Sequence, residues 1–170
     1  MPISLFDASI PVYKQMLRNL AAILDKAEAH AAVQGRDPTD LLEVRLAPDM
    51  HPLSRQIQMA SDAAKGGAAR LAGQIPPSMP DEEKTWAEFK DRVARTLAYV
   101  NSISRDQVDG REDAMIELAF PGRTMTFTGR DFLFQFSLPN FLFHVTTAYG
   151  LLRSQGVPLG KMDFLAGGGR

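Results

Sequence analysis

The first thirty residues carry apolar side chains with a helical period. These positions step by three and four, which is the spacing of one face of an α-helix; they are Phe6, Ile10, Tyr13, Leu17, Leu20, Leu24, Ala27 and Ala31. Ser4 is placed to cap this helix, and the run 34–38, which contains Gly35 and Pro38, ends it. Pro11 predicts either a kink or a later start at Ser9. The face is wide enough to pack against two neighbours.

Two further amphipathic helices follow in the pattern. The second begins near Asp49 or Met50, and Gly73 ends it. Small residues fill its second half between 63 and 73, which either permits a close approach of another helix or weakens this one. The third has Asp81 as its expected N-cap, because acidic residues follow it and inward-facing apolar positions begin at Trp86.

The period then changes from helical to strand-like. Residues 115–120 and 123–128 read as two strands, and Pro121-Gly122 between them is a turn signal. We expect this hairpin to lie on the helices as a flap. A fourth helix opens at Thr128 or Gly129, is kinked or split at Pro139, and runs to Gln155. The segment 159–165 carries apolar groups and is expected to dock, whereas 166–170 is expected to fray. The predicted fold class is all-α with a small β-hairpin before the last helix.

Composition narrows the class of protein. The 170 residues suit a single domain spanning 1–170, and the net charge of −1 gives no electrostatic case for binding nucleic acid or an anionic membrane. The absence of cysteine excludes disulfides, zinc–thiolate sites and cysteine nucleophiles. No run of about 20 apolar residues is present to span a membrane, and no signal peptide opens the chain. We expect a cytoplasmic protein.

The candidate chemistry centres on the last helix. Asn140 and His144 are four residues apart and therefore share a helix face, and a buried polar pair needs a partner. His51, at the start of the second helix, could meet His144 in one pocket. A zinc or nickel ion would then need a third ligand, for which Asn140 is poor and Asp49 or Asp62 better. The alternative is a core histidine that hydrogen-bonds Asn140 or a backbone carbonyl.

Other polar residues have simpler interpretations. Tyr149 is a pocket candidate as an acid or hydrogen-bond anchor, or else a core tyrosine with its hydroxyl at the rim. Lys161 and Asp163 are spaced to pin the C-terminal segment by an ion pair. His30, near the end of the first helix, is expected at the surface.

Four motifs carry a family resemblance over essentially the full chain. They are RLAPDM at 45–50, LPNF at 138–141, FHVTTAY at 143–149 and GVPLGKMDFL at 156–165. With them, the chain resembles the DinB/YfiT-like metalloenzyme superfamily, and more closely an uncharacterised branch of it, domain-of-unknown-function family number nineteen-ninety-three.

The resemblance implies an up-down-down-up four-helix bundle that forms a homodimer. The wide apolar face of the first helix is a second reason to expect a dimer. In the superfamily three histidines hold a metal, one on helix two and a pair four apart on helix four. His144 matches the second of that pair, but Asn140 stands at the first, and the helix-two position is His51 or Gln58. We therefore expect a small-molecule pocket or stress-related module. The alternative is a divergent metal-dependent enzyme, thiol-transferase-like or hydrolase-like, using His51 and His144.

Overall fold

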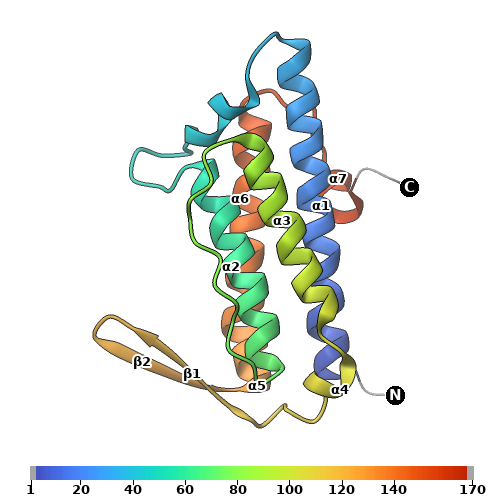
Figure 1. The fold of residues 1–170 in the computed structure, drawn as a ribbon, viewed down its shortest axis with the longest axis vertical. Coiled ribbons are helices and arrows are strands. Elements are labelled where there is room, and N and C mark those ends of the chain that lie inside the picture. Colours follow the sequence, from blue (N-terminus) through green and yellow to red (C-terminus); the bar gives the residue numbers. More distant parts are fainter. Residues whose placement is uncertain (1–2, 168–170) are drawn as a thin grey trace.

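Four long helices run side by side in the computed structural model, which describes residues 3–167 (Figure 1). They are α1 (Leu5–Val33), α2 (Leu53–Leu71), α3 (Trp86–Ser102) and α6 (Leu138–Ser154). The segment 72–85 returns along the whole bundle, so α2 and α3 run in the same direction, opposite to α1 and α6 (Figure 1). The expected up-down-down-up order is confirmed.

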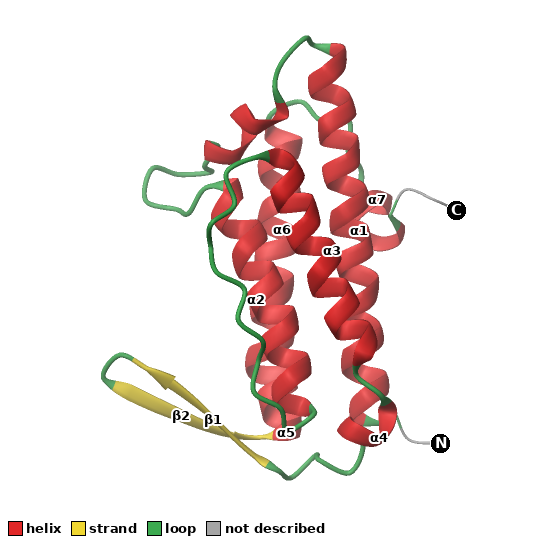
Figure 2. Ribbon diagram, in the orientation of Figure 1, coloured by secondary structure: helices red, strands yellow, loops and turns green. Residues whose placement is uncertain are grey.

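Shorter elements connect and extend the bundle. They are η1 (Pro38–Glu43), α4 (Arg105–Val108), β1 (Met115–Phe120), β2 (Arg123–Thr128), α5 (Gly129–Asp131), the π-helical η2 (Phe132–Ser137) and α7 (Lys161–Ala166). β1 and β2 pair antiparallel from Met115–Thr128 to Phe120–Arg123, so the predicted hairpin is confirmed. It extends from one end of the bundle (Figure 2), and it also packs on the helical part, because Phe120 and Phe127 contact Phe136 of η2. Only one face of β1, with Ile116 and Leu118, is buried.

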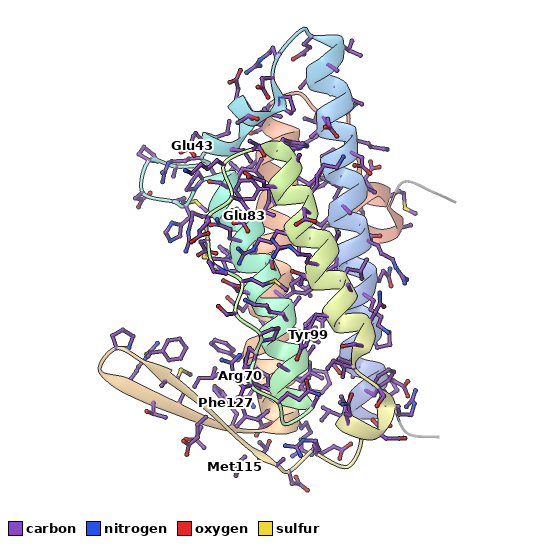
Figure 3. All side chains as sticks on the ribbon, in the orientation of Figure 1. Glu43, Arg70, Glu83, Tyr99, Met115 and Phe127 are labelled. Carbon is purple, nitrogen blue, oxygen red and sulfur yellow. The ribbon has the colours of Figure 1, made fainter. Side chains whose placement is uncertain are left out.

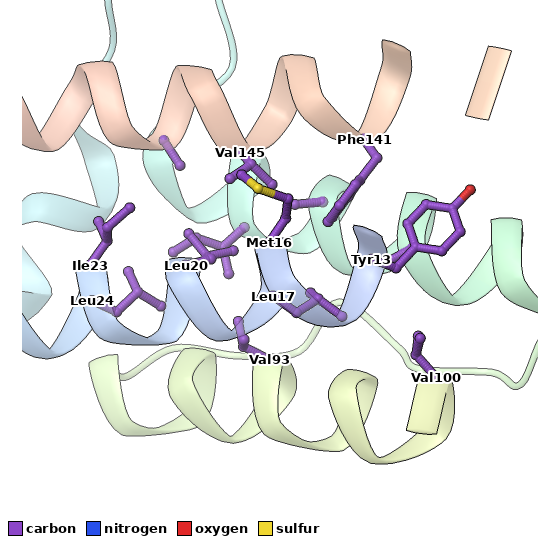
Figure 4. Packing of buried hydrophobic residues seen from close by; sticks show 14 of the residues in the cluster. Tyr13, Met16, Leu17, Leu20, Ile23, Leu24, Val93, Val100, Phe141 and Val145 are labelled. Carbon is purple, nitrogen blue, oxygen red and sulfur yellow. The ribbon is translucent and has the colours of Figure 1, made fainter. Parts of the chain in front are cut away.

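The core is built around α1. Its apolar face meets Phe141 and Val145 of α6 and Val93 of α3 (Figure 4). Tyr13 packs edge-on against Phe141, with ring centroids 5.3 Å apart. Each fully buried aliphatic or aromatic side chain contributes about 1.5–3 kcal/mol by leaving water. The face of α1 is therefore largely used within the chain itself.

Two helix starts differ from the sequence prediction. α2 begins at Leu53 with Pro52 as its cap, not at Asp49 or Met50. α3 begins after Thr85, whose side chain and that of Glu88 form a reciprocal capping box. That box satisfies two free backbone N–H groups at once, which a lone carboxylate does not. Asp81 instead pairs with Arg92 at 3.0 Å.

Pro11 in α1 and Pro139 in α6 are accommodated without a break in either long helix. α1 begins at Leu5, with Ser4 accepting from the Asp7 N–H, and continues through Pro11. Before Pro139 the helix widens into the π turn η2 and continues as α6, so it is not split there. Pro139 has no N–H to donate and its ring crowds the carbonyl four residues earlier, which a wider turn relieves.

The C-terminal segment docks on α1, as predicted. The side chain of Asn19 donates to the Phe164 carbonyl at 2.7 Å. Asp163 pairs with Lys26 of α1, not with Lys161, and accepts from the Gly160 N–H at 2.7 Å. The predicted fraying of 166–170 falls mostly on 168–170, which lie outside the described residues. Between residues 3 and 167, no helix has the length and apolar character needed to cross a membrane.

Candidate functional site

A cavity of about 390 Å³ opens between α2, α6 and the hairpin. One wall is α2, which presents Met59 and then small residues such as Ala63. The opposite wall is η2 and the start of α6, and Phe120 of the hairpin closes one end with Phe136. The rings of Phe120 and Phe136 are 6.2 Å apart. The walls are thus mainly apolar, with a few polar groups placed among them.

His144 supplies one of these polar groups, and its tautomer follows from its neighbours. Its Nδ1 is 2.8 Å from Oε1 of Gln56, and the Gln56 amide nitrogen donates to the His51 carbonyl at 3.3 Å. A backbone carbonyl only accepts, which fixes the orientation of the amide. Gln56 Oε1 must therefore accept from the Nδ1–H of His144. In the neutral imidazole this leaves Nε2 as an unprotonated acceptor.

The electrostatics keep this imidazole neutral. Burial lowers the pKa of His144 below its ordinary value of 6.5, and the positive charge of His51 lowers it further. At neutral pH the side chain is a hydrogen-bond acceptor and a base, not a cation.

The floor of the cavity is a close crossing of α2 over a buried polar pair. The hydroxyls of Tyr13 and Ser137 lie 2.7 Å apart, and burial raises the pKa of Tyr13. A Cβ on Gly67 would come within 2.5 Å of the Tyr13 hydroxyl oxygen and meet Ser137 as well. Gly67 is therefore required for the approach. The small residues of α2 serve close packing, one of the two interpretations that the sequence left open.

Two charged side chains belong to the lining, Asp62 and Arg70. Asp62 lies 2.6 Å from the Lys65 ammonium and 2.9 Å from the Arg92 guanidinium. Arg70 stands near the end of α2, close to the base of the hairpin (Figure 3). Its Nη1 donates to the Gly66 carbonyl at 3.1 Å, and burial lowers the pKa of its guanidinium.

The structure places the predicted site residues in different surroundings. Asn140 and His144 both line the cavity. His51 is exposed and lies two residues before α2 begins, within electrostatic range of His144. Asp49 is exposed in the loop before it. Tyr149 faces α7, with its ring 6.1 Å from that of Phe164.

The partner of His144 is a correction to the sequence analysis. It is neither Asn140 nor a backbone carbonyl but Gln56. Gln58, the other helix-two position considered, faces away and donates to Glu83 at 2.9 Å. Sequence reasoning also missed Arg70, for which the only signal was its place beside the small residues of α2. His30 is half-buried in α1 and lies outside the cavity lining.

The donor set does not fit a divalent transition metal. Such an ion takes three or more imidazole, thiolate or carboxylate ligands. In residues 3–167 no three His, Asp or Glu side chains converge in that way. Around His144 stand the amides of Gln56 and Asn140, and Nδ1 is already used. Binding of zinc or nickel stays a prediction.

Known proteins resemble the chain in sequence and in fold. Residues 5–165 match the family model described as Domain of unknown function (DUF1993). The crystal structure of a DinB family member protein from Shewanella denitrificans superposes with a TM-score of 0.86 at 42% sequence identity. The match covers 95% of this chain and 92% of that one. Among curated proteins, none matches.

Proposed function

We propose, from the premise that the chain belongs to the DUF1993 family of DinB-like proteins, that it binds a small organic molecule between α2, α6 and the hairpin. The observation that carries this proposal is the cavity of about 390 Å³ with mainly apolar walls and few polar groups. Ligand pockets are typically about 300–1,000 Å³ and share that character. We place this binding protein in the cytoplasm as a stress-related module.

Each wall has a part in such binding. The aromatic side chains of the hairpin and η2 pack against an apolar body, and Nε2 of His144 accepts a hydrogen bond from a ligand hydroxyl or amide. Gln56 acts as a positioning residue, because it holds the Nδ1–H of His144 and so fixes which nitrogen faces the ligand.

The alternative is a divergent metal-dependent enzyme, thiol-transferase-like or hydrolase-like, with His51 and His144 as ligands. What supports it is that His51 contributes to lowering the pKa of His144, so the two imidazoles lie within electrostatic range of each other. Elemental analysis after incubation with zinc or nickel tests it, using protein without a metal-binding tag. Stoichiometric metal that is lost in His144→Ala would support the metal-dependent enzyme. Absence of bound metal in the wild type would refute this alternative.

Titration with p-cresol tests the small-molecule proposal. Its ring suits the apolar walls and its hydroxyl can donate to His144. We expect saturable binding by ligand-observed NMR. Ala63→Leu fills the cavity and should weaken binding at least about tenfold, equivalent to about 1.4 kcal/mol. The matched control is Ala98→Leu, on an exposed position of α3. Binding that Ala63→Leu leaves intact would place p-cresol elsewhere and refute the proposal.

A further inference from the structure

The charge balance of the cavity wall identifies the class of ligand, provided that the cavity binds a small molecule as proposed above. Asp62 is compensated by Lys65 at 2.6 Å, and it shares Arg92 with Asp81 and Glu83. Arg70 has no carboxylate within 4.0 Å anywhere in residues 3–167, and its one protein acceptor is the Gly66 carbonyl. The lining therefore carries one uncompensated positive charge.

The position of Arg70 makes that charge costly to leave alone. The side chain is half-buried, and its guanidinium folds back over Gly66, where an added Cβ would come within 2.6 Å of Nη1. An arginine stays protonated, so partial burial removes hydration without removing charge. The helix dipole favours an arginine in the last turn of a helix, but it does so for an exposed side chain as well. The dipole therefore does not explain why Arg70 is half-buried. An anion at the guanidinium would restore the lost interaction.

The neighbouring side chains narrow the anion further. Aromatic rings gather at this end of the cavity: Phe136 lies 6.2 Å from Phe120 and 6.1 Å from Phe132, centroid to centroid. Their faces and edges suit another flat ring. One guanidinium binds a carboxylate through two parallel hydrogen bonds, and a single cation suits a monoanion.

We infer that the cavity takes a small aromatic monocarboxylate. Its carboxylate pairs with Arg70, and its ring packs against Phe120 and Phe136. The far end of the cavity, where His144 is neutral, takes an uncharged group. Arg70 thus determines specificity for the acid over an uncharged analogue of the same shape.

The test compares 3-phenylpropanoate with 3-phenylpropan-1-ol by isothermal titration calorimetry. We expect the wild type to bind the acid about tenfold more tightly than the alcohol, as a charge-assisted hydrogen bond predicts. Arg70→Gln should bring the acid to the level of the alcohol and leave the alcohol unchanged. Arg36→Gln is the matched control, because it removes an exposed positive charge in the loop after α1, at the opposite end of the bundle from the hairpin (Figure 1).

Gly66→Ala provides a second variant that keeps the charge. The new Cβ would displace the flexible end of Arg70, and alanine favours the helix, so the fold should be retained. Thermal unfolding checks this directly. We expect the preference for the acid to fall here as it does in Arg70→Gln.

The outcomes separate this inference from the proposed function. Equal binding of acid and alcohol by the wild type, with p-cresol still bound in the cavity, would overturn the carboxylate inference alone. A preference for the acid that survives Arg70→Gln would overturn it too. If neither probe nor p-cresol bound, both the inference and the proposed function would fall.

Discussion

His144 makes folding sensitive to pH in a narrow range. Its pKa in the folded chain is below the ordinary 6.5, because of burial and then the charge of His51. Below pH 6.5 the unfolded chain binds the proton first, so the free energy of unfolding falls as pH drops toward the folded pKa. We predict lower stability at about pH 5.5 than at about pH 7.5, by urea unfolding, and a smaller difference in His144→Gln.

The role of His51 in that dependence can be measured separately. His51→Gln removes a nearby positive charge and should raise the pKa of His144 toward its ordinary value, which an NMR titration of the ring protons reports. Because His51 is exposed, the substitution should leave the fold intact. An unchanged pKa would mean that burial alone sets it.

Gly67 and Gly150 form a matched pair at the scale of the helices. A Cβ on Gly67 would collide with the Tyr13–Ser137 pair, whereas one on Gly150 of α6 would meet nothing within 4 Å. Gly67→Ala should therefore lower the free energy of unfolding by about 1–3 kcal/mol. Gly150→Ala should raise it by about 0.5–1 kcal/mol, because alanine loses less backbone entropy in a helix. Chemical denaturation compares them, and equal effects would contradict the close crossing.

Arg92 of α3 binds the segment 72–85, which connects α2 to α3, to the helical bundle. Its side chain is fully buried and donates to Glu83 at 2.9 Å and to the Pro80 carbonyl at 3.1 Å. Arg92→Met would leave the buried Glu83 carboxylate without its main cation, which should cost about 3–5 kcal/mol. Arg95→Met is the comparison, because Arg95 lies farther from Glu83, at 3.8 Å, and its close pair with Asp91 is exposed. It should therefore contribute less than about 1 kcal/mol. Similar losses in the two variants by urea unfolding would refute this account.

Such long-range pairs explain which element boundaries the sequence did not predict. Helical and strand periods located the four long helices and the hairpin, because local patterning determines those. Asp81 was predicted as a cap because it precedes an acidic turn, but its actual partners, Arg92 and Arg55, are on α3 and α2. A local pattern contains no information about which distant cation a carboxylate will meet.

The candidate site shows the same limit at the level of one helix. The four-residue spacing of Asn140 and His144 predicted that both lie on one helix face, and in the structure both line the cavity. Choosing between Gln56 and Gln58 required the rotation of α2, since positions two apart on a helix point about 200° away from each other. Arg70 was missed because an arginine in a last helical turn is unremarkable until the hairpin over it is known.

Self-association belongs to the whole molecule, and the homodimer stays a prediction. The wide apolar face of α1 no longer supports it, because that face packs largely inside the chain. Large apolar side chains that are still exposed include Phe134 and Phe143, each 55% exposed and both carried on the helical stretch from η2 to α6. A dimer would have to bury exposed apolar side chains such as these, and not the apolar face of α1.

Light scattering at micromolar concentration tests the homodimer directly. If the wild type is a dimer through that helical stretch, Phe143→Ser should shift it toward monomer with little loss of stability, because the side chain is not in the core. Ile75→Ser is the matched control, since Ile75 is 92% exposed and belongs to the segment 72–85, outside the stretch from η2 to α6. A wild-type monomer would end the dimer prediction. A dimer that both variants preserve would require a different interface. The mass of the wild type therefore tests the oligomeric state, and the mass of Phe143→Ser tests the proposed interface.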